Sequence, residues 1–108
     1  MATANTVKQS KPSATTLTDL YTVPAATSAV CSTIVVCNQS ATATSFRISV
    51  APAGAADATS QYLYYDVAIP GNDTFATTIG VALATTDKIR VYNTLATLSF
   101  TAFIQETS

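Results

Sequence analysis

The sequence predicts an all-β fold: a single antiparallel β-sandwich of about seven strands, immunoglobulin-like or jelly-roll-like. Short apolar stretches alternate with polar residues at a period of two, which is typical of strands. Turn residues separate these stretches at regular intervals, and no stretch keeps the 3.6-residue period of a helix. The chain of 108 residues is also rich in Thr, whose branched side chain fits the pleated surface of a sheet.

The elements follow one another along the chain with turn signals between them. Residues 1–13 show no period, so we expect an extended N-terminal arm there and the sandwich domain in residues 14–108. Pro70 should end a strand, and the Gly-Asn-Asp sequence after it tolerates the dihedral angles of a turn. The expected strands occupy residues 17–23, 29–37, 45–50, 61–69, 74–83, 88–92 and 97–105.

Alternation assigns the faces of these strands. The first strand should direct Leu17, Asp19, Tyr21 and Val23 to one side. The strand at 29–37 is apolar on both faces, with Val30, Ile34 and Val36 on one, which is typical of a strand covered on both sides. The expected core residues are Phe46, Ile48, Val50, Leu63, Tyr65, Val67, Phe75, Ile79, Val81, Ile89, Val91, Leu98, Phe100 and Ile104.

Cys31 and Cys37 lie on one expected strand, and their even spacing places them on the same face. Such a strand separates them by roughly 20 Å, whereas the Cα atoms of a disulfide lie within about 7 Å. We expect two buried free thiols, with an intermolecular disulfide in an assembly as the alternative.

Outward-facing Tyr and Arg side chains form a candidate interface. Alternation directs Arg47, Arg90 and Tyr92 outward, and it places Tyr62 and Tyr64 opposite the expected inner face of their strand. Tyr and Arg are enriched among the residues that contribute most to binding at protein interfaces. The alternative is simple packing between solvent-facing neighbours, worth about 0.2–1 kcal/mol per cross-strand pair.

The N-terminal arm is a candidate tether to a neighbouring subunit. Residues 1–13 contain too few apolar side chains to join the core. Pro12 favours an extended path, Val7 offers an apolar contact, and Lys8 and Lys11 suit an acidic groove on a neighbour. The alternative is an arm folded back on the edge of its own sheet.

Composition excludes several classes of function. The chain has no His, which removes imidazole catalysis and His metal ligands. Five basic and six acidic residues give a net charge of −1, which excludes a broad basic surface for nucleic acid. No apolar run approaches the roughly 20 residues of a membrane span, and we expect no secretory signal. Asp66 and Asp73 flank one turn without a pocket signature, so we expect no catalysis. Asp57, Asp66, Asp73 and Asp87 are spread over separate loops and strands, so we expect no metal site, and no cofactor is expected.

From Pro12 to Ile104 the sequence resembles a family of small proteins of tailed bacteriophages. The matching stretches are ATTLTDLYTVPAATSAV (14–30), IVVCNQSATATSFRISVAPAGAADATSQYLYYDVAIPGNDTFATTIG (34–80) and DKIRVYNTLATLSFTAF (87–103). The resemblance implies a virion structural or fibre-associated protein and brings no catalytic residues with it. It implies a location in the phage particle.

We therefore expect a non-enzymatic structural protein on the exterior of a tailed-phage virion, assembled in the host cytoplasm. The first expectation is a decoration or cement subunit on the outside of the head, because a charge-poor surface suits a protein packed against neighbours. A small tail, baseplate or fibre subunit is the alternative, and a module that binds host carbohydrate through Tyr62 and Tyr64 is a third. The expected partners are further copies of the chain, first as a trimer, and virion proteins such as the major capsid protein or tail proteins.

Overall fold

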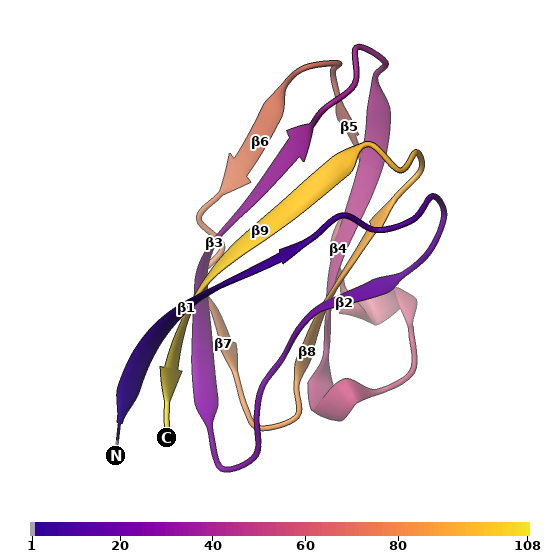
Figure 1. Ribbon diagram of the computed structural model, residues 1–108. Helices are drawn as coiled ribbons and strands as arrows, with labels where there is room; N and C mark the ends of the chain where they lie inside the picture. Colours follow the sequence, from indigo (N-terminus) through magenta and orange to yellow (C-terminus); the bar gives the residue numbers. More distant parts are fainter. Residues whose placement is uncertain (1) are drawn as a thin grey trace.

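The computed structural model describes residues 2–108, which form nine strands and two short 3₁₀ turns (Figure 1). The turns, η1 (Pro52–Gly54) and η2 (Thr59–Gln61), lie in the long loop between β4 and β5. In this part of the chain no helix is long and apolar enough to cross a membrane. The strands are β1 (Thr3–Ser10), β2 (Thr18–Thr22), β3 (Ser28–Asn38), β4 (Thr44–Ala51), β5 (Tyr62–Ile69), β6 (Thr74–Thr77), β7 (Val81–Leu83), β8 (Lys88–Asn93) and β9 (Leu98–Thr107).

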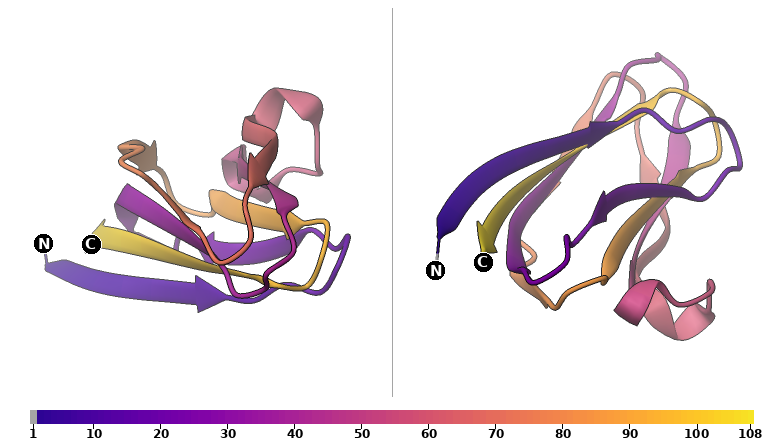
Figure 2. Two further views of the ribbon diagram at one scale, coloured as in Figure 1. Left: turned by 90° about the horizontal axis from the view of Figure 1, so that it is seen from above. Right: turned by 60° about the horizontal axis from the view of Figure 1, so that its bottom comes forward.

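Two antiparallel sheets pack face to face as the layers of a sandwich (Figure 2). The first, the β9 sheet, has the order β1-β9-β3-β6, with β7 also paired to β3; the second, the β8 sheet, has the order β2-β8-β4-β5. The pairing is nested, because β1 pairs with β9, β2 with β8, β3 with β6 and β7, and β4 with β5. Nested pairing of this kind is the jelly roll. The predicted β-sandwich is confirmed, and of its two expected forms the jelly roll is observed.

The core lies between the two sheets and draws side chains from both. Phe46 of β4 and Phe100 of β9 are fully buried, with ring centroids 6.2 Å apart in an edge-to-face arrangement. Phe75 of β6 packs against Phe46 at 5.3 Å. Every predicted core residue except Leu63 and Tyr65 is buried or packs against this cluster. The other buried apolar residues are Leu20, Tyr21, Val23, Ala29, Cys31, Ile34, Val36, Ile48, Ala51, Ile69, Leu83, Ile89, Val91, Leu98, Ala102 and Ile104.

The N-terminal segment is an edge strand of the sandwich, which corrects the expectation of a separate arm in residues 1–13. β1 pairs with β9 in an unbroken antiparallel register, from Thr3 opposite Thr107 to Ser10 opposite Phe100. The two chain ends therefore lie side by side (Figure 1). Backbone hydrogen bonds to β9 offset the entropy of ordering a segment that buries little apolar surface. Met1, which the expected arm includes, lies outside the described residues.

A β-bulge at Ser32 divides β3 into two halves with opposite facing. Cys31, before the bulge, and Ile34, after it, both point into the core. Uninterrupted alternation would place these two side chains on opposite faces of the strand. Val30, expected beside Ile34, is instead 43% exposed, and β3 is not covered on both sides. The expected strand beside it breaks at the same level into β6 and β7, where the backbone N–H of Ile79 donates to the carbonyl oxygen of Ser32 at 3.0 Å.

The same bulge gives the two cysteines different environments. Both are free thiols, but Cys31 is fully buried and Cys37 is only half-buried. Burial raises the pKa of the Cys31 thiol to about 11, which keeps it protonated and unreactive at neutral pH. We therefore expect iodoacetamide to label Cys37 in the folded protein and Cys31 only after denaturation, as measured by mass spectrometry of the labelled peptides. Equal labelling of both thiols in the folded protein would contradict this difference.

A second bulge, in β5, overturns the predicted faces of that strand. Tyr65 and Asp66 together lie opposite Arg47 of β4, and Asp66 adopts a positive φ of 51°. From here back to a further register shift at Leu63, the strand faces the other way from the prediction, whereas Tyr62, before that shift, lies beside Tyr65 as an outward residue. Leu63 and Tyr65, expected in the core, are 47% and 54% exposed, whereas Tyr64, expected outside, turns inward.

A third bulge lies in β2, where the pairing with β8 shifts between Asp19 and Tyr21. As a result Leu20 and Tyr21 are both buried, while Asp19 lies on the outer surface. Asp19 and Tyr21 therefore do not share a face, contrary to the expectation for the first strand.

Asn38 joins two turns at one end of the sandwich. Its side chain is almost fully buried, and its Nδ2 donates to the carbonyl oxygens of Thr42 at 2.9 Å and Pro70 at 3.1 Å. Its Oδ1 accepts the backbone N–H of Ser40 at 3.1 Å. One satisfied polar side chain thus fixes the loop after β3 against the turn after β5.

Candidate protein–protein interface

The outer face of the β8 sheet carries the candidate interface. Arg47 of β4 and Tyr92 of β8 lie directly opposite each other in the antiparallel register. Their neighbours Phe46 and Val91 are fully buried, so alternation directs the Arg47 and Tyr92 side chains outward. Strand register alone therefore places a cation beside an aromatic ring.

The guanidinium of Arg47 lies between two tyrosine rings. Its Cζ is 4.2 Å from the ring centroid of Tyr65 and 4.4 Å from that of Tyr92. Both distances are within the range of cation–π attraction. Asp66 accepts hydrogen bonds from Arg47 Nε at 2.6 Å and Nη2 at 3.3 Å. These two bonds fix the orientation of the guanidinium plane. The hydrogen bond to Asp66 also raises the pKa of Arg47, so the guanidinium stays charged.

The β5 bulge is what brings Tyr65 and Asp66 to Arg47. Two residues oppose one at this point, so both side chains reach the same guanidinium. A residue with positive φ is required in the bulge, and Asp adopts that conformation more readily than most residues. The sequence analysis missed Tyr65 because uninterrupted alternation assigned it to the core. The only local signal was an Asp inside an apolar strand.

Tyr62 extends the group toward the long loop. Its ring meets that of Tyr65 edge-to-face, with centroids 5.1 Å apart, and its hydroxyl donates to Asp57 Oδ2 at 3.1 Å. Partial burial and the bond to Asp57 raise the pKa of Tyr62, so the phenol remains a neutral donor. We call Arg47, Tyr62, Tyr65, Asp66 and Tyr92 the Arg47 cluster.

Tyr64 does not belong to this surface, although the sequence analysis placed it there. Its ring lies 5.6 Å from Phe75 and 6.4 Å from Phe46 at the margin of the core. Its hydroxyl lies 2.6 Å from Thr77 Oγ1, so the polar end is satisfied within the fold. Tyr64 therefore acts in packing, and the expectation that it faces outward is wrong.

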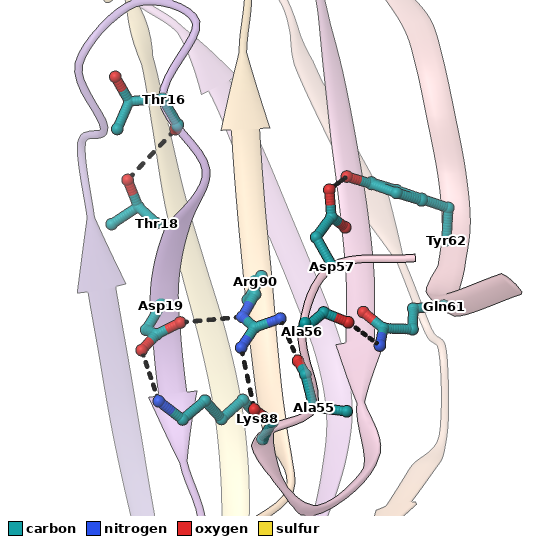
Figure 3. Close-up of polar contacts among 11 residues, drawn as sticks. Thr16, Thr18, Asp19, Ala55, Ala56, Asp57, Gln61, Tyr62, Lys88 and Arg90 are labelled. Carbon is teal, nitrogen blue, oxygen red and sulfur yellow. Dashed lines mark hydrogen bonds and ion pairs between the residues drawn. The ribbon is translucent and has the colours of Figure 1, made fainter. Parts of the chain in front are cut away.

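Arg90 lies on the same sheet but is bonded to the long loop between β4 and β5 instead of to the Arg47 cluster. Asp19 accepts hydrogen bonds from Lys88 Nζ at 2.9 Å and Arg90 Nε at 3.2 Å (Figure 3). The other guanidinium nitrogens of Arg90 donate to the carbonyl oxygens of Ala55 at 2.7 Å and Gly54 at 3.3 Å. The bond from Lys88 lowers the pKa of the Asp19 carboxyl, and Arg90 adds to this while partial burial opposes it.

Further hydrogen bonds order the long loop between β4 and β5, to which Arg90 is bonded. The backbone N–H of Ala53 donates to Asp87 Oδ1 at 2.7 Å, and Gln61 Nε2 donates to the carbonyl oxygen of Ala56 at 2.8 Å. Asp57, on the same loop, contacts Tyr62 of the Arg47 cluster (Figure 3). The loop and the cluster thus form one continuous, internally bonded surface.

The arrangement is suited to contact with a protein partner. The ordered Arg and Tyr side chains give a partner flat aromatic area and a fixed cation at little cost in side-chain entropy. The carboxylate of Asp66 is engaged by Arg47, and Asp73 accepts the backbone N–H of Thr74. Within residues 2–108 no group of three or more His, Cys, Asp or Glu side chains could hold a metal ion.

The four residues proposed for an arm tether lie along or just after β1. Val7 is 52% exposed, and Lys8 and Lys11 are also exposed. Pro12 is buried, and its carbonyl oxygen accepts a hydrogen bond from Asn93 Nδ2 at 3.3 Å. Pro12 therefore anchors the segment to its own domain.

Comparison of the chain with protein-family models and with curated proteins gave no match.

Proposed function

We propose that this protein is a non-enzymatic structural subunit of a tailed-phage virion, with an accessory decoration or cement role on the outside of the head. The observation that carries the binding role is the Arg47 cluster, in which the guanidinium is held between the rings of Tyr65 and Tyr92. The charged groups that contact it, Asp66 and Asp57, are bonded to Arg47 and Tyr62 within the fold, and charged residues make up only 10% of the whole chain. Tyr and Arg side chains that reach the surface are enriched in protein interfaces.

The architecture supports this role without deciding it. Jelly rolls occur in viral capsid domains and in lectins, and a fold alone does not determine function. The location in a phage particle comes from the sequence resemblance. A small tail, baseplate or fibre subunit is the alternative, because it would use the same kind of contact. The expected carbohydrate site needed the rings of Tyr62 and Tyr64 side by side on the surface. Tyr64 instead packs at the margin of the core, so this pair of stacking rings is not formed.

The test is incorporation of a variant into particles assembled in host cells. Replacing Tyr65 with Ala removes an exposed ring of the Arg47 cluster without opening the core, because Tyr65 is 54% exposed. Loss of a binding hot spot of at least about 2 kcal/mol should lower the affinity for the particle more than tenfold. Quantitative mass spectrometry of purified particles, supplied with limiting amounts of the chain, measures the bound fraction.

The matched control is Leu95→Ala, which truncates a comparably exposed apolar side chain in the turn between β8 and β9. It should bind as the parent chain does. Parental occupancy for Tyr65→Ala would refute the role of the Arg47 cluster.

A further inference from the structure

The four sheet edges of the sandwich differ in regularity. β5 contains the bulge at Asp66, β2 contains the register shift after Asp19, and β6 and β7 are separate short strands. Bulges and short strands are devices that protect an edge from pairing with another chain. β1 has none of these in the described chain: it keeps one register over its whole length, and Lys8 is its only charged residue.

The hydrogen-bonding groups on the open side of β1 can be identified from its pairing with β9. The backbone N–H of Ala2 donates to the carbonyl oxygen of Ser108 at 2.7 Å, and that of Ser108 donates to Ala2 at 2.8 Å. Ala2 and Ser108 are thus a hydrogen-bonded pair, and such pairs recur at every second residue of an antiparallel ladder. The even-numbered residues bond to β9. The residues whose backbone groups point away from β9 are Thr3, Asn5, Val7 and Gln9.

An exposed apolar patch adjoins this open edge. Val7 lies opposite Phe103 in the register of β1 with β9, and the two side chains are 52% and 41% exposed. Val30 of β3, 43% exposed, lines the same shallow depression on the outer face of the β9 sheet. Exposed apolar patches mark interaction sites, and a free strand edge can accept a further strand.

We propose that β1 pairs antiparallel with β1 of a second copy of this chain, about a two-fold axis at Thr6. This axis places Asn5 opposite Val7 of the second copy and Thr3 opposite Gln9 of the second copy. All four residues with free backbone groups are then paired, which no other register achieves. The pairing ends where the chain turns away before Pro12, so it uses the full strand.

Charge and apolar contacts favour a second copy as the occupant. Lys8 lies across from Ala4 of the second copy, and the two lysines are four residues apart along the ladder. That separation is about 13 Å, beyond the Debye length of about 8 Å at physiological salt. The two Val7 side chains become diagonal neighbours on the outer face, so the patches of the two copies join into one apolar stripe.

The expected contact is a weak, closed dimer. A single strand pair buries less than the roughly 1,200–2,000 Å² of stable complexes, so we expect association in the micromolar to millimolar range. The trimer expected from the sequence would use the Arg47 cluster on the other sheet. The β1 contact leaves that cluster free and does not depend on the proposed virion role.

Cysteine cross-linking tests the axis directly. In a Cys37→Ser background, Thr6→Cys places two thiols directly opposite each other in a non-hydrogen-bonded pair, with Cα atoms about 4.5 Å apart, within disulfide range. Ala4→Cys is the matched control, because its two copies would lie about 13 Å apart. Mild oxidation should cross-link most of the Thr6→Cys chain and little of the control. Equal yields from the two variants, or none from Thr6→Cys, would overturn the axis.

A proline substitution separates association from folding. Asn5→Pro removes an outward N–H and leaves the bonds between β1 and β9 intact, as proline does on edge strands. Sedimentation equilibrium should show loss of the dimer with Asn5→Pro and its retention with Asn5→Ser, while the melting temperature of both stays near that of the parent chain. A dimer that survives Asn5→Pro, or a trimer in the parent chain that dissociates only on removing Tyr65, would overturn the proposal.

Discussion

Replacing Phe100 with Ala should lower the free energy of unfolding by about 3–5 kcal/mol, the usual cost of removing a buried aromatic ring. The ring is fully buried and meets Phe46 edge-to-face across the two sheets. Its loss leaves a cavity between two hydrogen-bonded sheets that cannot collapse freely. Because small domains have only about 5–15 kcal/mol of stability in total, this single change should bring the protein close to unfolding at physiological temperature.

Urea denaturation followed by circular dichroism measures this loss. The matched control is Phe103→Ala, which removes the same ring from the outer face of the same strand, where Phe103 is 41% exposed. Its loss opens no cavity between the sheets, so this variant should cost clearly less than Phe100→Ala. Similar losses for the two variants would mean that the face assignment of β9 is wrong.

Replacing Gly71 with Ala should also be strongly destabilising, at about 1–3 kcal/mol, the usual cost of overpacking. A Cβ at this position would lie 2.1 Å from the carbonyl oxygen of Ala41, which is backbone and cannot rotate away. The loop holding Ala41 is fixed by the hydrogen bonds of Asn38 to Thr42 and Pro70. Relief of the clash must therefore separate the two turns, which would also break the bond from the backbone N–H of Asn72 to Ser40 at 2.8 Å.

Gly80→Ala is the informative comparison. Gly80 has a positive φ of 61°, but no atom lies within 4 Å of an added Cβ. Its substitution should cost only the strain of a left-handed conformation, about 1 kcal/mol. Thermal unfolding of both variants measures the difference, and a larger loss for Gly80→Ala than for Gly71→Ala would contradict the close approach of the two turns.

The sequence analysis located the strands because burial on one face leaves a period of two. Phe46, Ile48, Ile89 and Val91 alternate without interruption, and all four are buried as expected. Alternation fails wherever a bulge adds one residue, because every later side chain then changes face. The Ser32 and Asp66 bulges have no strong local signal, since neither is a glycine. They depend on pairing with strands distant in the sequence.

The residues of the candidate interface were likewise predictable on regular strands and not at a bulge. Arg47 and Tyr92 lie on regular strands and face outward as predicted, whereas Tyr64 and Tyr65 exchanged roles through a slip of one residue at the bulge. The edge position of β1 was only the alternative in the sequence analysis, for another reason. Its order comes from backbone bonds to β9, and backbone bonding leaves no pattern in the side chains.

Cryo-electron microscopy of purified phage particles tests the central claim most directly. If the chain is an accessory head protein, its jelly roll should be visible in many symmetry-related copies on the outer surface of the head. The Arg47 cluster should then lie against a neighbouring subunit. A few copies confined to the tail would move the protein to the alternative location. Particles that lack the chain altogether would contradict the proposal that it is a virion structural protein.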